Sequence, residues 1–157
     1  MKIISINFWK IRQNICNSTG IKKKYNIFLY KKLMQKYNCF IPWRTNIKGQ
    51  PHFPHGISGV FISKNAIIGE NCTIFHQVTI GSNSFDDSKQ SGSPQIGDNV
   101  FIGAGAKIIG GIRVGNNVRI GAGCVVAQDI PDNATVVMPK PRIIAHENIL
   151  DNRYKII

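Results

Sequence analysis

An apolar residue returns at every sixth position through most of this chain. These lead residues are Ile62, Ile68, Ile74, Ile80, Ile96, Ile102, Ile108, Val114, Ile120 and Val126. A helix has a period near 3.6 residues and an ordinary strand a period of 2, so neither explains a period of six. A unit this short cannot bury its own apolar side and must stack on its neighbours. The repeat therefore predicts an all-β solenoid, a triangular prism with three units, or 18 residues, in each coil and the lead residues along its axis.

The position four places after each lead residue is mostly small or β-branched, as a second inward-facing position requires. These residues are Ala66, Cys72, Val78, Ser84, Val100, Ala106, Ile112, Val118, Cys124 and Ile130. The four cysteines show no CxxC spacing, and Cys72 and Cys124 fall on this inward position, so we expect these two to be buried free thiols, which are typical of a reducing compartment. No apolar run approaches the ~20 residues of a membrane span, and the first residues lack the features of a secretory signal. These observations favour a cytoplasmic protein.

The chain divides into three parts: a basic, helical segment at 1–40, the solenoid at 41–144 and a short tail at 145–157. Two insertions interrupt the repeat. Three extra residues lie between Phe53 and Ile62, and ten lie between Ile80 and Ile96. The second insertion forms a polar loop at about 82–95. Polar loops on rigid scaffolds commonly carry binding functions, so we expect this one to contact a substrate.

The net charge of +12 is concentrated at the beginning of the chain. Residues 1–50 contain eleven Lys or Arg and no Asp or Glu. Apolar residues at helical spacing between about Lys24 and Tyr37 predict an amphipathic helix, which suits either packing against the prism or a peripheral contact at the inner membrane face. A solvated helix face is a third interpretation. Nucleic acid ranks last as a partner, because no nucleic-acid-binding motif is present.

Two histidines fall on one corner of the expected prism. His55 and His76 are 21 residues apart, which is one coil of 18 plus the three-residue insertion. They should therefore project from adjacent coils about 5 Å apart. A metal site needs a third ligand, which this corner does not offer, so we expect no metal. His52 and His146 fall elsewhere and are expected to be bystanders.

The same corner continues upward through small residues. Two Gly-Ala-Gly sequences, 18 residues apart, should stack above the histidines; their candidate ligand-binding members are Gly103, Ala104, Gly105, Ala122 and Gly123. Small residues let a ligand approach the backbone closely, and amide groups at such turns can bind it. The sequence thus predicts a histidine base at the foot of a channel lined by backbone.

Four segments carry a resemblance to a known family. They are the hexapeptide repeat, Pro54-His55-Gly56-Ile57, IFHQVTIG at 74–81, and IGAGAKIIGGIRVGNNVRIGAGCVV at 102–126. Over about 41–144 the chain resembles the serine acetyltransferase branch of the left-handed β-helix acyltransferases. The resemblance implies a left-handed parallel β-helix, a homotrimer with active sites between subunits, and acetyl-CoA as donor. It also implies His55 as general base, with Arg142 and nearby Lys140 beside the CoA phosphates.

Several positions depart from that family. The family has Asp where this chain has Pro54, an Arg-His pair where it has Gly92 and Ser93, and a His-orienting Asp near Phe40. An amino-acid zwitterion needs charged partners, so these departures favour another acceptor.

We therefore expect O-acetylation of a sugar hydroxyl in surface polysaccharide biosynthesis. The loop offers hydrogen-bonding groups for such an acceptor, namely Asn83, Ser84, Asp86, Asp87 and Ser91. His76 would hold the acceptor or donate to the developing oxyanion. The first alternative is a serine O-acetyltransferase of cysteine biosynthesis. The second is a non-catalytic trimeric scaffold that docks through its basic segment.

Overall fold

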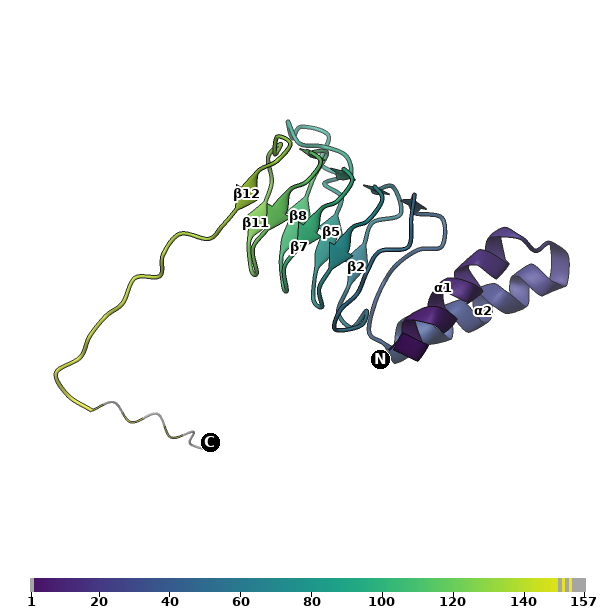
Figure 1. The fold of residues 1–157 in the computed structure, drawn as a ribbon, viewed down its shortest axis with the longest axis horizontal. Helices are drawn as coiled ribbons and strands as arrows, with labels where there is room; N and C mark the ends of the chain where they lie inside the picture. Colours follow the sequence, from purple (N-terminus) through teal and green to yellow (C-terminus); the bar gives the residue numbers. More distant parts are fainter. Residues whose placement is uncertain (1, 150, 152, 154–157) are drawn as a thin grey trace.

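The computed structural model describes residues 2–149, 151 and 153. Two helices, α1 (Lys2–Cys16) and α2 (Gly20–Lys36), form a hairpin at one end of a solenoid, and an extended tail leaves its other end (Figure 1). The expected helical segment thus consists of two antiparallel helices. Within the described residues, neither helix is long and apolar enough to cross a bilayer.

Three parallel sheets form the sides of the prism. The first contains β1 (Asn46–Ile47), β3 (Ile67–Ile68), β6 (Gln95–Ile96) and β9 (Arg113–Val114). The second contains β4 (Thr73–Ile74), β7 (Phe101–Ile102), β10 (Arg119–Ile120) and β12 (Thr135–Val136). The third contains β2 (Phe61–Ile62), β5 (Thr79–Gly81), β8 (Lys107–Ile109) and β11 (Val125–Val126). Paired residues such as Ile102 and Ile120 are 18 apart, so the predicted hexapeptide β-helix is confirmed.

The lead residues fill the axis of the prism. All ten are at most 3% exposed, and Ala66, Cys72, Val78 and Cys124 are buried beside them. Burying each Ile side chain contributes about 1.5–3 kcal/mol, so this stacked column is the main source of stability. Ser84 is the exception among the expected inward positions, because the chain leaves the prism after Gly81 and exposes it.

One corner of the prism is built from asparagines in the left-handed region. Asn71, Asn99, Asn117 and Asn133 have φ between 52° and 60°. Their side chains form a ladder in which Asn99 Nδ2 donates to Asn117 Oδ1 (3.2 Å) and Asn117 Nδ2 donates to Asn133 Oδ1 (3.0 Å). Asn tolerates this conformation better than most residues, which explains its recurrence here.

The helical hairpin closes the first coil. Phe8 packs against Tyr30, and Trp9 stacks on Phe53 of the solenoid. The Tyr30 hydroxyl, buried between the two parts, donates a hydrogen bond to the Ile41 carbonyl (2.8 Å). The hairpin therefore shares one apolar core with the prism.

The solenoid ends earlier than the expected boundary at 144. β12 is the last strand, and residues 137–149 contain neither helix nor strand. The next lead position after Val136 would be Arg142, which is polar, and Pro139 and Pro141 lack the amide hydrogen that a further strand needs. Of the expected tail at 145–157, residues 150, 152 and 154–157 lie outside the described part.

Candidate active site

His55 and His76 lie together on the corner between the second and third sheets, called here the histidine corner (53–58, 75–78, 103–106 and 121–124). Their Nδ1 atoms are 3.2 Å apart and their ring centroids 5.2 Å apart, as the spacing predicted. In a hydrogen bond between two ring nitrogens, one must carry the proton and the other must offer a lone pair. The pair therefore fixes complementary tautomers, and the donor ring leaves its own Nε2 unprotonated.

A phenylalanine supports this pair from the second sheet. Phe75 meets the His55 ring edge-on, with centroids 5.0 Å apart, and Phe75 itself packs against Phe101. His55 is exposed, whereas His76 is half-buried. An exposed ring held by two neighbours can reach a substrate without losing its orientation. No carboxylate that could orient His55 was evident in the sequence; in the structure, His76 and Phe75 contact the His55 ring instead.

The two Gly-Ala-Gly turns stack above His76. The Gly105 amide donates to the His76 carbonyl (3.1 Å), and the Gly123 amide donates to the Ala104 carbonyl (2.8 Å). These glycine amides thus join the coils and cannot serve a ligand. No backbone carbonyl of the described residues accepts from the amides of Ala104 or Ala122, so these two remain the candidate donors.

The glycines of these turns have different roles. Gly105 and Gly123 adopt φ of +70°, and an added Cβ would meet open space at either position. They leave the outer surface of the corner smooth. Gly103 is buried, and a Cβ there would lie 2.6 Å from the Ala122 amide nitrogen. Gly103 is therefore needed for packing between coils, which corrects its expected role as a ligand contact.

The polar loop does not lie on the histidine corner of its own chain. It leaves after β5 and returns at β6, on the opposite edge of the third sheet. The Asn83 side chain shapes the loop, because it donates to Ser88 Oγ (2.7 Å) and accepts from the Phe85 amide (3.0 Å). Asn83 thus shapes the loop, and its contact with a substrate stays a prediction. Ser84, Asp86 and Asp87 are exposed.

The two basic residues expected at the CoA phosphates lie in the extended tail. Lys140 and Arg142 are both exposed. The tail follows β12, a strand of the second sheet, so it departs from the histidine corner and then runs away from the prism (Figure 1). The structure does not bring these side chains onto the corner.

The other candidate groups do not extend the site. Cys39, Cys72 and Cys124 are buried, and burial raises the pKa of Cys39 to about 11 and raises that of Cys72. Raised thiol pKa values disfavour acetyl exchange through a cysteine. The described residues contain no group of three side chains suited to a metal ion.

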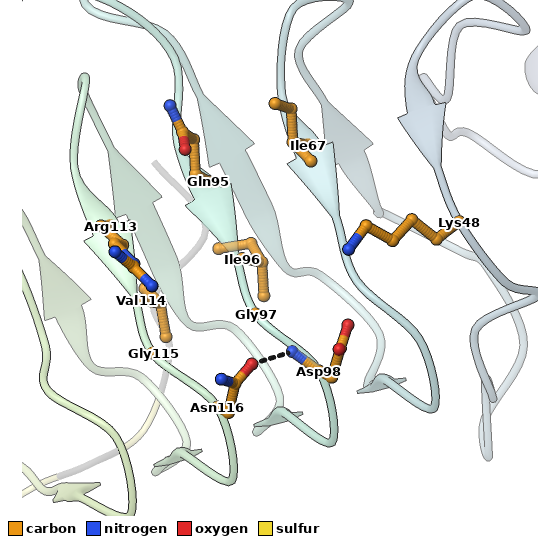
Figure 2. Close-up of a pocket in the computed structure, with 10 residues that line it drawn as sticks. All are labelled: Lys48, Ile67, Gln95, Ile96, Gly97, Asp98, Arg113, Val114, Gly115 and Asn116. Atoms are coloured by element: carbon orange, nitrogen blue, oxygen red, sulfur yellow. Dashed lines mark hydrogen bonds between the residues drawn. The ribbon is translucent and has the colours of Figure 1, made fainter.

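A groove that was not predicted from the sequence lies on the first sheet. Lys48, Gln95, Asp98, Arg113 and Asn116 line its polar walls, and Asn116 Oδ1 accepts from the Asp98 amide (Figure 2). Gly97 and Gly115 form its floor, where the coils pack too closely for a Cβ. The histidines lie on the edge shared by the other two sheets, so this groove is separate from their corner.

Three comparisons relate the chain to known proteins. Residues 93–128 match the sequence family described as bacterial transferase hexapeptide (six repeats). A serine acetyltransferase of Synechococcus elongatus is 45% identical over 97 residues, which are 60% of this chain and 38% of that protein. A chloroplastic serine acetyltransferase of Arabidopsis thaliana is 49% identical over 89 residues, or 55% of this chain and 27% of that protein.

Solved structures agree with the sequence matches. A serine acetyltransferase from Entamoeba histolytica in complex with cysteine has a TM-score of 0.66 and 36% identity, covering 79% of this chain and 44% of that chain. The Neisseria gonorrhoeae enzyme in complex with serine has a TM-score of 0.63 and 35% identity, covering 76% and 48%. The chain spans less than half the length of the curated relatives it matches. It is thus a hexapeptide-repeat β-helix similar to serine acetyltransferases.

Proposed function

We propose that this protein is an acetyl-CoA-dependent O-acetyltransferase that uses His55 as general base. The observation that carries the proposal is the pair formed by His55 and His76 at the foot of the smooth Gly-Ala-Gly corner. An exposed base beside a surface that a substrate can approach closely is what direct transfer to a hydroxyl requires. The similarity to serine acetyltransferases supports the same chemistry.

His55 performs the proton transfer in this mechanism. Its Nδ1 donates to His76 Nδ1, which leaves the lone pair of His55 Nε2 facing the acceptor. Nε2 removes the hydroxyl proton as the acceptor oxygen attacks the thioester carbonyl. It then returns this proton to the departing CoA sulfur. General-base catalysis of this kind contributes about 10²–10⁴ in rate.

His76 acts here as a positioning residue for His55. From the sequence, His76 was expected to hold the acceptor or to donate to the oxyanion, but its Nδ1 lies 3.2 Å from the His55 Nδ1. A neutral imidazole can accept a hydrogen bond from the Nδ1–H group of His55, as a carboxylate does in other catalytic histidine pairs. His76 thus takes over the part of the missing carboxylate near Phe40.

The acetyl donor, acetyl-CoA, is proposed to lie on the Gly-Ala-Gly part of the histidine corner. Acetyl-CoA would lie over Gly105 and Gly123, where no side chain obstructs it, and the amides of Ala104 and Ala122 would donate to its pantetheine carbonyls. The tail that carries Lys140 and Arg142 begins at this corner, and these side chains would contact the CoA phosphates if the tail folded back. A homotrimer would bring the polar loop of a neighbouring subunit to this corner, which the loop of the same chain does not reach.

L-serine is the acceptor that the comparisons favour. All the relatives named above are serine acetyltransferases, and one was solved with serine. The comparisons therefore support what was the first alternative from the sequence, and they offer nothing for a sugar. A sugar hydroxyl is retained as the second candidate because Pro54, Gly92 and Ser93 provide no charge for a zwitterion.

Thiol release from acetyl-CoA tests this proposal. Purified protein is assayed with L-serine in one arm and with sugars and nucleotide sugars in the other. Serine-dependent release assigns the serine acceptor, and sugar-dependent release assigns the second candidate. If no thiol is released in either arm and calorimetry detects no binding of acetyl-CoA, the enzyme proposal is overturned and the non-catalytic scaffold is favoured.

A further inference from the structure

The outer face of α2 combines exposed apolar side chains with lysines. Ile21, Tyr25 and Phe28 are 87%, 60% and 56% exposed. They lie at i, i+4 and i+7, so they follow one line along the helix. A membrane-facing helix presents this arrangement, with aromatic and aliphatic groups at its centre.

Lysines flank this line on both sides. Lys24 and Lys31 lie on one side, Lys36 on the other, and Lys32 continues the line with its Nζ 5.8 Å from the Phe28 ring. No Asp or Glu occurs in the sequence before Glu70, so the helix carries no carboxylate to neutralise them. We name Ile21, Lys24, Tyr25, Phe28, Lys31 and Lys32 the outer face of α2.

The opposite side of α2 is already occupied. Tyr30 and Asn26 are buried, and Ile27, Leu33 and Met34 pack against the protein core. The apolar face that the sequence identified therefore holds the hairpin to the prism. Only the outer face is available for a partner, and its large apolar side chains remain in solvent.

We propose that the outer face of α2 docks on an anionic lipid surface. The lysines would meet lipid phosphates, and Ile21, Tyr25 and Phe28 would enter the boundary between headgroups and acyl chains. A second copy of this face is a poor partner, because lysines without carboxylates repel one another. Nucleic acid is the less favoured partner, because the sequence contains no nucleic-acid-binding motif. This inference is independent of the acetyltransferase proposal, since it involves none of the residues on the histidine corner.

Vesicle sedimentation of the intact chain tests the proposal, with phosphatidylcholine vesicles alone or with about 30% phosphatidylglycerol. Two variants address the face: Lys24→Gln/Lys31→Gln/Lys32→Gln, and Ile21→Ser/Phe28→Ser. A matched control removes three exposed charges from the prism, Lys64→Gln/Arg113→Gln/Arg119→Gln. Circular dichroism checks that each variant is folded.

We expect binding to the anionic vesicles only, weakened roughly tenfold or more at high salt and in both face variants, and retained in the control. No binding at low salt would overturn the proposal, as would equal loss in the control. Preferred binding of a DNA duplex, unaffected by Ile21→Ser/Phe28→Ser, would assign the face to nucleic acid. A fall in molecular mass by sedimentation in that variant would assign it to self-association. Either result would contradict a lipid partner.

Discussion

The Nδ1 atoms of His55 and His76 lie 3.2 Å apart, although 21 residues separate them in the sequence. The prism creates this contact, because one coil plus the three-residue insertion returns the chain to the same corner. In the proposed mechanism, the contact leaves one nitrogen of His55 for the acceptor and commits the other to His76. The two histidines should therefore respond differently to substitution.

His55→Ala removes the base itself. We expect it to lower kcat at least about a hundredfold, as loss of general-base catalysis does. Stability should change little, because His55 is exposed. Steady-state kinetics and thermal unfolding measure both effects. A normal turnover rate in a folded variant would contradict the mechanism.

His76→Ala and His76→Asn distinguish the hydrogen bond that orients His55 from the packing of the His76 side chain. The Asn side chain places an oxygen acceptor near the position of the His76 Nδ1, whereas Ala offers none. We expect His76→Ala to lower kcat roughly tenfold or more with little change in KM for acetyl-CoA, and His76→Asn to recover part of that loss. Equal loss in both variants would show that hydrogen bonding to His55 is not what His76 contributes.

Gly105→Ala tests whether acetyl-CoA lies over the Gly-Ala-Gly part of the histidine corner. Gly105 has φ of +70° and faces open space, so the added methyl group would project from the smooth surface on which acetyl-CoA is proposed to lie, and it adds backbone strain of about 1–2 kcal/mol. Gly20→Ala is a matched control, since Gly20 also has positive φ and open space but begins α2. Only Gly105→Ala should raise the KM for acetyl-CoA. If both variants lose stability and neither changes KM, acetyl-CoA does not pass over Gly105.

The repeat made the prism predictable, because a period of six in residues such as Ile102 and Ile120 allows few other arrangements. The stacking of His55 on His76 followed from the same count. Hydrogen bonding was less accessible to prediction. The amides of Gly105 and Gly123 donate to carbonyls of the coil below, and the Asn83 side chain donates to Ser88 within its own loop. Such partners depend on three-dimensional geometry that spacing alone does not give.

The end of the solenoid and the position of the polar loop are two further features that residue spacing alone did not predict. The sequence predicted that the prism extends to 144, but the last coil is two residues shorter than the others, since Ile120 pairs with Val136, and no strand follows Val136 among the described residues. The loop was expected to contact a substrate, as the histidines were. In the structure, the third sheet separates the loop from the histidine corner, since each strand of the prism turns the chain to a new side.

Thiol reactivity tests the burial of the cysteines. Cys16 is exposed, whereas Cys39, Cys72 and Cys124 are buried, and burial raises the pKa of Cys39 and Cys72. We expect one of the four thiols to react quickly with an aromatic disulfide reagent near pH 8, and all four after unfolding. Cys16→Ser should abolish the fast reaction. A second fast thiol would contradict the burial of the prism axis.

Tyr30→Phe tests the join between the hairpin and the prism. The substitution leaves the buried Ile41 carbonyl without its donor, which costs about 1–3 kcal/mol of unfolding free energy at neutral pH. Burial also raises the pKa of Tyr30 well above its ordinary value of 10.0. Above about pH 10 the unfolded chain releases this proton while the folded chain retains it, so stability falls as pH rises, by up to about 1.4 kcal/mol per pH unit.

The phenylalanine variant lacks this titration, so the stability difference between the two proteins should shrink above about pH 10. Urea unfolding at a series of pH values measures it. A difference that stays constant from neutral to alkaline pH would mean that Tyr30 is not buried un-ionised against Ile41. A large loss of helix signal in Tyr30→Phe at neutral pH, with the prism still folded, would mean that the hairpin and the prism unfold separately rather than as one core.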